Sequence, residues 1–446
     1  MSALSERGPS QVPASLPAPV SSRRRFAPGF GRLVSANTMS GLGDGIRIIA
    51  LSVYAATVTD DPVQVSLVTV AGELPWLLVG PFAGTLIDHV DRWRALWVCD
   101  AARSLVLACF TALVLADRVG IAALAVTAFL LTSVETMADN LAQAVIPQMV
   151  GTRSLDTANS RVLSGRLITM EFLGPPVGTA LFALAHLLPF GVATVCFAVS
   201  TVLVFGVRPA GAASGDKSAR LSPRLLGAQT AQGIRWLWRH RLLRTVCLLM
   251  ALLNFAVLAV LGIAVLYAMH TLGVSETVYG LLLLVIAAGG LLGLAVAPKV
   301  VAVAGRGRSL QLVFAMSPLP FVVAAVTSNA LVAACALVFV GIAVSISNVI
   351  TTTLRQELVP EESFGRVNGA YRLVLNGLAP LGGLTGGFVA DQAGLRAPFL
   401  LAAALLAVGA LASFRLLSDR AVEPFADRPA GTSDPASPTS TETADQ

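Results

Sequence analysis

Twelve runs of mostly apolar residues constrain this 446-residue chain more than any other feature. A membrane-spanning helix needs about 20 such residues to cross the hydrocarbon core. Only 13% of the residues are charged, against about 25% in soluble domains. The runs are continuous rather than alternating, which favours helices over a membrane barrel. We therefore predict an all-α membrane protein whose twelve transmembrane helices lie near residues 33–58, 63–87, 95–116, 121–146, 160–185, 187–206, 243–268, 277–302, 309–327, 330–354, 367–390 and 396–417.

A long basic linker divides the predicted spans six and six. At one constant offset of 209 residues, six identities recur: Gly80 with Gly289, Gly84 with Gly293, Val150 with Val359, Asn159 with Asn368, Gly174 with Gly383, and Gly178 with Gly387. The shared offset predicts two pseudo-symmetric six-helix bundles, which is the plan of a transporter that rocks around a midplane site. The predicted parts are a disordered N-terminal arm, a first bundle, a linker, a second bundle and a disordered tail, at residues 1–30, 31–206, 207–242, 243–418 and 419–446. Within the linker, residues 225–240 are predicted to form an amphipathic helix on the inner membrane surface, with a solvated connector as the alternative.

The distribution of positive charge predicts the orientation of the chain. The net charge of +6 is better explained by the excess of positive residues in short cytoplasmic loops than by binding to nucleic acid. Arginines fall in the N-terminal arm, the linker and alternate loops, so we predict that both termini are cytoplasmic. The first 30 residues carry no apolar core and do not resemble a cleavable signal peptide. Arginine outnumbers lysine 29 to 2, which suggests a GC-rich bacterial genome and hence the bacterial cytoplasmic (inner) membrane.

Charged residues crowd into the predicted loop between spans 2 and 3 and the first turns of span 3. Gly84 would let two helices approach closely, and Asp88 would accept hydrogen bonds from the exposed N–H groups that begin a span of the other half. The following charges would hold the cytoplasmic face shut as a latch that can also open. A positive loop that merely sets the topology is the alternative. The residues of the predicted cytoplasmic gate are Gly84, Asp88, Arg92, Arg94, Asp100 and Arg103.

These residues carry a family resemblance. Gly84-x-x-x-Asp88 followed by Arg92 and Arg94 resembles the loop motif of the major facilitator superfamily, G-x-x-x-D-[RK]-x-G-R-[RK]. The stretch D-H-V-D-R-W-R is similar to the variant of the drug:proton antiporter branch that includes enterobactin and macrolide exporters. The sequence departs from the pattern at His89, Asp91 and Trp93. The resemblance covers about residues 30–418 and implies the major facilitator fold, a monomer, and a contact of Asp88 with the start of span 11.

A second motif lies in span 5, within EFLGPPVGTAL (171–181). It resembles the G-P-x-x-G signature that antiporters of this family carry and that its symporters usually lack. Gly174, Pro175 and Gly178 predict a kinked, thin helix against which another helix can slide. Ordinary packing of helix glycines is the alternative.

Ionisable residues inside membrane helices are costly and are candidates for function. Counted from the span ends, Asp44, Glu73, Glu135 and Glu171 all fall near mid-helix, and all belong to the first half. A carboxylate poised between burial and a nearby arginine can bind a proton on one side of the membrane and release it on the other. Asp44 and Glu135 are therefore the leading proton carriers, whereas Glu73 and Glu171 could instead be packed against an arginine. The predicted proton-coupling residues are Asp44, Arg47, Glu73, Glu135, Asp139 and Glu171.

The second half is neutral at the same depth apart from one arginine, and its aromatic residues fit an apolar or amphiphilic substrate. The candidates for the substrate cavity are Asn254, Asn348, Arg372 and Asn376. The five cysteines are scattered through apolar runs without ligand spacing, which favours packing over a metal site or disulfides.

The chain contains no G-x-x-x-x-G-K-[ST] loop and no H-E-x-x-H motif. ATP-driven transport is therefore not predicted, and the chain is not expected to be an enzyme or to bind a metal or another cofactor. The predicted function is proton-coupled export of a small, moderately hydrophobic compound such as an antibiotic, a toxic metabolite or a siderophore. A proton-coupled importer of a sugar or organic acid is the alternative within transport. A membrane sensor or enzyme on the same fold, which does not transport, is the alternative from another class.

Overall fold

The computed structural model describes residues 29–80, 90–150, 155–207 and 223–417. Within these ranges, all twelve predicted apolar runs lie in helices. The helices of the first half are α1 (Phe30–Val58), α2 (Pro62–Leu78), α4 (Arg92–Leu115), α5 (Ile121–Met149), α6 (Leu155–Leu167), the π-helix η2 (Ile168–Leu173), α7 (Gly174–Leu184) and α8 (Leu188–Val204). The linker and second half contain α9 (Pro223–Arg239), α10 (Arg241–Leu261), α11 (Ala264–Leu266), the π-helix η3 (Tyr267–Thr271), α12 (Glu276–Met316), α13 (Pro318–Val326), α14 (Ala330–Leu358), α15 (Glu361–Gly377), α16 (Ala379–Ala393) and α17 (Ala397–Leu416).

The described helices have the lengths that membrane crossing requires. Nine helical segments among the described residues are long and apolar enough to span a bilayer, and α2 and α8 are shorter apolar helices. The longest segment, Glu276–Val326, joins two of the predicted runs. Gly305 interrupts it with φ 74° and ψ 165°, a conformation that glycine adopts without steric cost. The arrangement is consistent with the twelve predicted spans.

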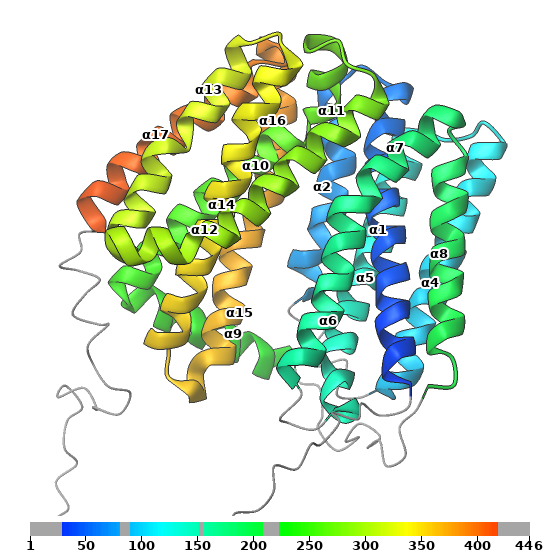
Figure 1. The fold of residues 1–446 in the computed structure, drawn as a ribbon, viewed down its shortest axis with the longest axis horizontal. Coiled ribbons are helices and arrows are strands. Elements are labelled where there is room, and N and C mark those ends of the chain that lie inside the picture. Colours follow the sequence, from blue (N-terminus) through cyan, green and yellow to red (C-terminus); the bar gives the residue numbers. More distant parts are fainter. Residues whose placement is uncertain (1–28, 81–89, 151–154, 208–222, 418–446) are drawn as a thin grey trace, which may run out of the picture.

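The two halves of the chain repeat the same helix plan. Helices α5 and α14 are both 29 residues long and begin 209 residues apart, at Ile121 and Ala330. Helices α8 and α17 also begin 209 residues apart, at Leu188 and Ala397. This is the offset of the sequence repeat, so the structure confirms two pseudo-symmetric bundles. Figure 1 shows the first bundle in blue to teal on the right and the second in green to orange on the left.

Side-chain oxygens explain where several of these helices begin. Asp61 accepts hydrogen bonds from the N–H groups of Val63 and Gln64, and Asn329 caps α14 in the same way. Asp91 likewise accepts from the N–H groups of residues 93 and 94 and begins α4. Such caps satisfy donors that the first helical turn leaves free. Asp91, which departs from the family's loop motif, therefore has a structural role of its own.

Glycines allow neighbouring helices to pack closely within and between the bundles. Inside the second bundle, a Cβ atom on Gly289 would lie 2.2 Å from the carbonyl oxygen of Val338. Between the bundles, a Cβ atom on Gly280 of α12 would lie 2.3 Å from Thr179 Oγ1 of α7. On the other side of the bundle interface, a Cβ atom on Gly387 of α16 would lie 2.1 Å from the Ser66 hydroxyl of α2. Small residues at such positions are typical of helix contacts in membranes.

The contacts between the bundles gather at one end of the molecule. The α7–α12 and α2–α16 contacts lie at the end opposite α9 in Figure 1. At the same end, His270 of η3 lies 3.5 Å from Asp60, which directly precedes the cap of α2. The bundles are thus held together at the end that the predicted orientation places outside the cell.

Substitution of Gly280 by valine is expected to open this end of the interface, because the new side chain would overlap Thr179 of α7. Spin labels on the native, exposed Cys109 of α4 and Cys335 of α14 report the separation of the bundles, with the other three cysteines replaced by alanine. The label distance should increase by several ångströms in Gly280→Val. It should not change in Gly191→Val, since a Cβ atom at Gly191 meets nothing within 4 Å. Equal distances in the two variants would contradict the prediction.

The amphipathic segment predicted at 225–240 is α9, and the structure packs it against α15 and the start of α10. Gly233 allows the closest approach, because a Cβ atom there would lie 2.2 Å from the Arg366 carbonyl oxygen. The Arg366 guanidinium donates a hydrogen bond of 2.6 Å to Gln232, and Leu237 is completely buried. Helix α9 therefore packs on the surface of the second bundle.

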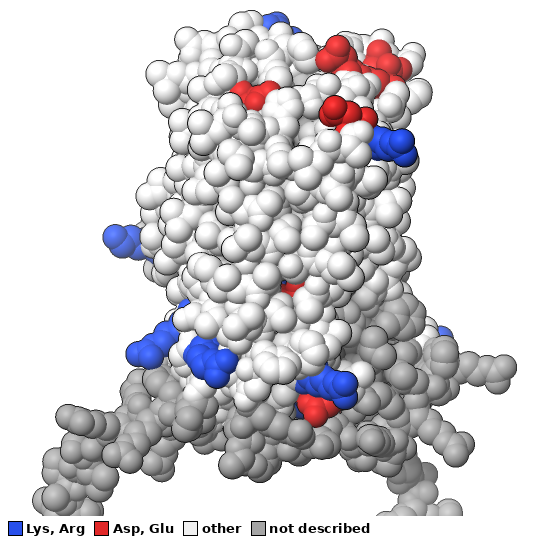
Figure 2. All heavy atoms as spheres, turned by 90° about the vertical axis from the view of Figure 1, so that its right-hand side faces the viewer, with Lys and Arg blue, Asp and Glu red and all other residues white. Residues whose placement is uncertain are grey.

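The distribution of surface charge agrees with a membrane protein. Figure 2 shows one face of the molecule, on which charged side chains gather toward the two ends and leave a broad, almost uncharged band between them. Such a band suits contact with lipid hydrocarbon, where exposed charges are costly.

Candidate functional site

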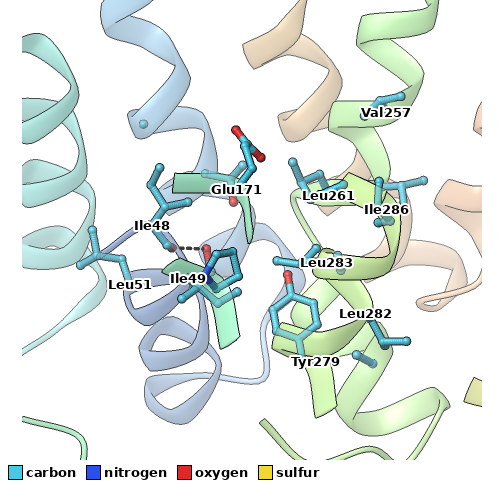
Figure 3. Close-up of a pocket in the computed structure, with 18 of the residues that line it drawn as sticks. Ile48, Ile49, Leu51, Glu171, Val257, Leu261, Tyr279, Leu282, Leu283 and Ile286 are labelled. Carbon is cyan, nitrogen blue, oxygen red and sulfur yellow. Dashed lines mark hydrogen bonds between the residues drawn. The ribbon is translucent and has the colours of Figure 1, made fainter. Parts of the chain in front are cut away.

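A cavity of about 460 Å³ lies between the two bundles. The first bundle contributes residues from α1, α2, α5, η2 and α7, and the second contributes residues from α10 to α14 and from α17. Figure 3 shows Ile48 and Ile49 on one side of this cavity and Leu261, Leu283 and Ile286 on the other. The cavity lies between the two bundles, which is where transporters built from two such halves bind their substrate.

The two walls of the cavity differ in chemistry. The first-bundle wall carries ionisable side chains, namely Arg47, Glu73, Glu135 and Glu171. The second-bundle wall is formed by aliphatic and aromatic side chains, and its polar groups are the hydroxyls of two tyrosines. Tyr267 donates its hydroxyl to the Ala324 carbonyl at 2.5 Å, whereas Tyr279 lies on α12 beside Leu282 and Leu283 (Figure 3). The asymmetry expected from the sequence is thus present around one cavity.

Behind the first-bundle wall lies a buried charge cluster, defined as Asp44, Arg47, Asp100, Arg103, Glu135, Asp139 and Arg166. Arg47 donates through Nε to Asp44 Oδ1 at 2.8 Å and through Nη2 to Glu135 Oε2 at 2.5 Å. The other oxygen of Asp44 accepts from Arg103 Nη1 at 2.8 Å. Asp44 and Arg47 share a face of α1 because they are three residues apart. Arg47 is therefore the bridge between α1 and α5.

Arg103 extends the buried charge cluster along α4. Its guanidinium forms an ion pair with Asp100 and donates to the Ser40 hydroxyl at 2.5 Å. It also lies over the Phe197 ring of α8, with 4.5 Å between Cζ and the ring centroid. The second oxygen of Asp100 accepts from the Ser200 hydroxyl at 2.5 Å. Buried charges are stable only when they are paired and hydrogen-bonded in this way.

Arg166 closes the cluster on the side of α6. Its guanidinium donates to Glu135 Oε1 at 2.7 Å and forms an ion pair with Asp139, one turn further along α5. Glu135 therefore holds one guanidinium on each of its oxygens, Arg47 and Arg166. Because Glu135 and Arg47 also line the cavity, the cluster and the cavity are contiguous at these two side chains.

The cluster contains four carboxylates and three guanidiniums. Arginine stays protonated in proteins, so the fully ionised cluster carries one net negative charge. Binding of one proton to a carboxylate would make the cluster neutral. The buried charge cluster can therefore exist in a negative and a neutral state that differ by one bound proton.

Glu73 and Glu171 are placed differently from Asp44 and Glu135. Both line the cavity, and neither forms a hydrogen bond or ion pair with a residue in the described part of the chain. Glu171 lies in η2, and Figure 3 shows its carboxylate in the space between the two bundles. Among the described residues, neither glutamate forms an ion pair with an arginine, although the positive charge of Arg166 acts on Glu171 from the same helix.

The predicted cytoplasmic gate is divided by the structure. Gly84 and Asp88 lie outside the described residues. Arg92 begins α4, and Arg94 is exposed two residues later. Asp100 and Arg103 do not lie beside these two arginines but belong to the buried charge cluster. They are eight and eleven residues beyond Arg92, which at about 1.5 Å per residue places them about 12–16 Å along the helix from the loop.

The G-P-x-x-G motif of span 5 forms the crossing of α7 with α1. A Cβ atom on Gly174 would lie 2.4 Å from Gly45 Cα, and one on Gly178 would lie 2.4 Å from a methyl of Ile49. Pro175 and the following proline have no N–H group, so two carbonyls of the preceding turn lose their usual helical donors. That preceding turn is the π-helix η2, a distortion often found at functional sites. The motif therefore explains both the close helix contact and the irregular backbone that carries Glu171.

None of the four substrate candidates of the second half lines the central cavity. Asn254 donates its side-chain amide to the Leu375 carbonyl at 3.1 Å, which links α10 to α15. Arg372 is exposed on α15, and Asn376 is half-buried in the same helix. Asn348 lines a different cavity, on the side of the molecule. The depth of each residue in the membrane can be estimated from the sequence by counting from the span ends. The direction in which its side chain points, toward the cavity or away from it, cannot.

The structure also shows a cationic contact in the second half that the sequence pattern did not single out. The Arg355 guanidinium stacks on the Tyr371 ring at 4.0 Å and donates to Asn368 Oδ1 at 3.0 Å. This contact joins the end of α14 to α15, and Asn368 corresponds by the 209-residue offset to Asn159 in the first half. No group of three or more His, Cys, Asp or Glu side chains within the described ranges is placed to hold a metal ion.

Comparisons with known proteins agree with this architecture. A family model described as transmembrane secretion effector matches residues 24–428. The multidrug efflux pump Tap of Mycolicibacterium fortuitum is 28% identical over 401 residues, which cover 86% of this chain and 94% of that pump. The multidrug efflux pump Tap of Mycobacterium tuberculosis (strain ATCC 25618 / H37Rv) is 28% identical over 422 residues, which cover 90% of this chain and 97% of that pump.

Solved transporter structures share the fold. A mutant form of the nucleoside transporter NupG superposes with a TM-score of 0.73 at 13% identity, over 88% of this chain and 100% of that chain. A bacterial homologue of the iron transporter ferroportin in an inward-facing state superposes with a TM-score of 0.70 at 18% identity, over 87% of this chain and 98% of that chain. At these identities the likeness concerns the arrangement of the helices alone.

Proposed function

Because this chain belongs to the transmembrane secretion effector family, we propose that it exports a small, moderately hydrophobic compound in exchange for protons. The chain is a multi-pass membrane transporter of the major facilitator type, and its relatives identify it as a secondary efflux transporter. The proposed cargo is an antibiotic, a toxic metabolite or a siderophore, and the name of the Tap pumps supports the first of these. The proposed location is the bacterial inner membrane, with both termini in the cytoplasm and the protein a monomer.

The observation that carries the proposal is that the cavity adjoins the buried charge cluster, which contains one more carboxylate than guanidinium groups. Glu135 belongs to both, so a proton that enters the cavity reaches the cluster without crossing a layer of apolar packing. When Asp44 binds that proton, the surplus negative charge disappears and Arg47 and Arg103 have one fewer charged partner. When Glu135 binds it, the surplus charge likewise disappears, and Arg47 and Arg166 have one fewer charged partner. The ion pairs that join α1, α5 and α6 would then weaken together.

This change of pairing offers a physical link between protonation and movement. Arg47 holds α1 to α5, Arg103 holds α1 to α4, and Arg166 holds α5 to α6. A ligand shifts a conformational equilibrium only through different affinity for the two states, and a proton would do so here by changing how these pairs are satisfied. We assign Asp44 and Glu135 as the leading proton carriers, with Arg47 and Asp139 as their partners and with Glu73 and Glu171 as further carboxylates in the cavity wall.

The cavity supports a small organic substrate. Its volume of about 460 Å³ falls within the range of about 300–1,000 Å³ that is typical of small-molecule sites. The apolar second-bundle wall would bind the hydrophobic part of the substrate, and the carboxylates opposite would favour polar or cationic groups. A sugar would be expected to need more hydrogen-bonding side chains than this wall provides, which favours export of a hydrophobic compound over sugar import.

The cytoplasmic gate remains part of the proposal. Gly84, Asp88, Arg92 and Arg94 are proposed to close the end of the molecule at which α4 begins, when the contacts at Gly280 and Gly387 release the opposite end. Asp100 and Arg103 are assigned instead to the buried charge cluster, because Arg103 pairs with both Asp44 and Asp100.

An accumulation assay in efflux-deficient bacteria tests the proposed function. Cells that express this chain are expected to accumulate at least about threefold less of a fluorescent hydrophobic drug than cells with an empty vector, and an uncoupler should remove the difference. Uptake that an uncoupler abolishes would favour a proton-coupled importer of a small metabolite. Absence of any flux would favour a sensor or enzyme on the same fold.

A further inference from the structure

A crevice of about 450 Å³ lies on the surface of the second bundle, between α10, α16 and α17. This α10–α17 crevice is separate from the central cavity, because the two share no lining residue. Six of its seven lining side chains are leucine or phenylalanine, and the seventh is Thr385. The Thr385 hydroxyl donates a hydrogen bond of 2.7 Å to the Leu381 carbonyl. The walls are therefore apolar and leave no hydroxyl without a partner, which suits a hydrocarbon chain.

One face of α10 runs from this crevice to the end of the helix that follows α9. Arg241 begins α10, and Leu248 lies seven residues later, which is close to two full turns. Leu252 and Phe255 follow near three and four turns, so the three crevice residues share a helix face with Arg241. Arg241 and Leu248 are the exposed residues among the first ten of α10. The crevice therefore has an arginine about 10 Å from its near end, on the same side of the helix.

Cations without partners gather where α9 meets α10. Arg235, Arg239 and Arg241 are exposed, and none of them forms a hydrogen bond or ion pair with another residue in the described ranges. Helices α9, α10 and α17 contain no aspartate or glutamate that could pair with them. Arg235 and Arg239 are one turn apart on α9, where like charges repel each other. An anion bound between these guanidiniums would relieve that repulsion.

The corner between α9 and α10 lies at the boundary of the membrane. Arg241 is the first residue of a helix, Arg241–Leu261, that spans a bilayer by length and composition. Trp238 precedes it by three residues with 42% of its surface exposed, and tryptophan is typical of the interface between hydrocarbon and headgroups. Arg244 fixes the corner, because it donates to the Trp238 carbonyl at 3.1 Å. The exposed arginines therefore lie at the level of lipid headgroups, and the α10–α17 crevice lies at the level of acyl chains.

We propose that this site binds an anionic phospholipid, with its phosphate at Arg239 and Arg241 and one acyl chain in the α10–α17 crevice. In the proposed orientation the lipid belongs to the cytoplasmic leaflet. Guanidinium groups bind phosphate oxygens through paired hydrogen bonds, and arginines at a membrane surface attract acidic lipids. A zwitterionic phospholipid has the same chains and phosphate but adds a cation that the arginines repel. Arginines that only set the topology of the chain are the competing explanation, which predicts no preference among lipids.

Titration of the delipidated, purified protein with phospholipid, followed by native mass spectrometry, tests the headgroup site. The probes are phosphatidylglycerol and phosphatidylcholine with the same acyl chains, and wild-type protein should bind the first at least about fivefold more tightly. Arg241→Gln is expected to weaken phosphatidylglycerol binding about fivefold, and its combination with Arg239→Gln about 25-fold. Arg241→Lys keeps the charge and should keep most of the affinity. Lys299→Gln is the matched control, because Lys299 is an exposed cation on α12, which does not line the crevice.

The acyl-chain site is tested separately. Leu248→Trp would fill the α10–α17 crevice and should weaken phosphatidylglycerol binding at least about fivefold, because the chain would bury fewer CH₂ groups. Leu411→Trp is its control, since Leu411 is exposed on α17 but does not line the crevice. The two leucines lie at similar depth, because Gly409 of α17 packs against Leu249 of α10.

Several results would overturn the inference. Equal affinity of the wild-type protein for the two phospholipids, or equal effects of Arg241→Gln and Lys299→Gln, would show that the arginines serve only the topology. Equal effects of Leu248→Trp and Leu411→Trp would exclude the crevice as the acyl-chain site. Displacement of the bound lipid by inorganic phosphate, which has no acyl chain, would identify a site for free phosphate instead. These measurements involve no transport, so their outcome is independent of the proposed export function.

Discussion

Replacement of Glu135 by glutamine is expected to reduce substrate-driven proton movement in proteoliposomes to the background level, a loss of at least about tenfold. The substitution keeps the shape of the side chain and one acceptor oxygen, but it removes one of the four negative charges of the buried cluster. The cluster would then be neutral without a proton, which imitates the protonated state at every pH. Binding of a proton would no longer distinguish the two conformations, so it could not be coupled to transport.

Exchange of substrate for substrate across the same membrane needs no net proton movement and should continue in Glu135→Gln. Asp44→Asn is expected to behave similarly, because Asp44 shares Arg47 with Glu135. Glu357→Gln provides the control, since Glu357 forms an exposed ion pair with Arg306 away from the cavity. Undiminished proton movement in both cluster variants would exclude these carboxylates as the proton carriers.

Replacement of Arg103 by methionine is expected to lower the free energy of unfolding by about 3–5 kcal/mol, the usual cost of leaving a buried charge without its partner. Arg103 contacts Asp44, Asp100 and Ser40, and its side chain is almost completely buried. Methionine would fill the space above the Phe197 ring but would leave Asp100 without its ionic partner and Asp44 with Arg47 alone. Denaturant titration of the purified protein in mixed micelles measures the change.

Two further variants make this result interpretable. Arg118→Met, at an exposed position after α4, should alter the free energy of unfolding by no more than about 0.5 kcal/mol. Arg103→Met combined with Asp100→Asn should recover part of the lost stability, because it removes the carboxylate that Arg103→Met leaves without its ionic partner. If Arg103→Met were as stable as Arg118→Met, the buried charge cluster would not be a stabilising element of the first bundle.

The sequence predicted the helices well because the requirement for them is local. Each span must satisfy its own backbone hydrogen bonds and present apolar side chains to lipid, so an apolar run of sufficient length becomes a helix whatever its neighbours are. Asp61, Asp91 and Asn329 mark helix starts by the same local logic. The offset of 209 residues found in the sequence repeat also separates the first residues of α5 and α14, because equivalent apolar runs form equivalent helices.

The candidate site was predicted in part. The mid-helix depth of Asp44, Glu73, Glu135 and Glu171 could be counted from the span ends, and the three-residue spacing of Asp44 and Arg47 placed them on one helix face. Depth alone did not separate the carboxylates paired with arginine from the two that line the cavity unpaired. Asp100 and Arg103 have the same three-residue spacing, and counting their distance from the loop would have placed them inside the membrane.

The sequence by itself determined the number of apolar runs, their division into two related halves and the confinement of buried acids to the first half. These properties depend on composition and on spacing along one chain. The tertiary structure decided which charges meet, because Arg47, Arg103 and Arg166 find their partners on helices up to 88 residues away. It also decided that Glu171 lines the cavity between the bundles, since that position depends on how η2 faces α12. Helix rotation and crossing are set by packing between helices, and an isolated sequence pattern does not contain them.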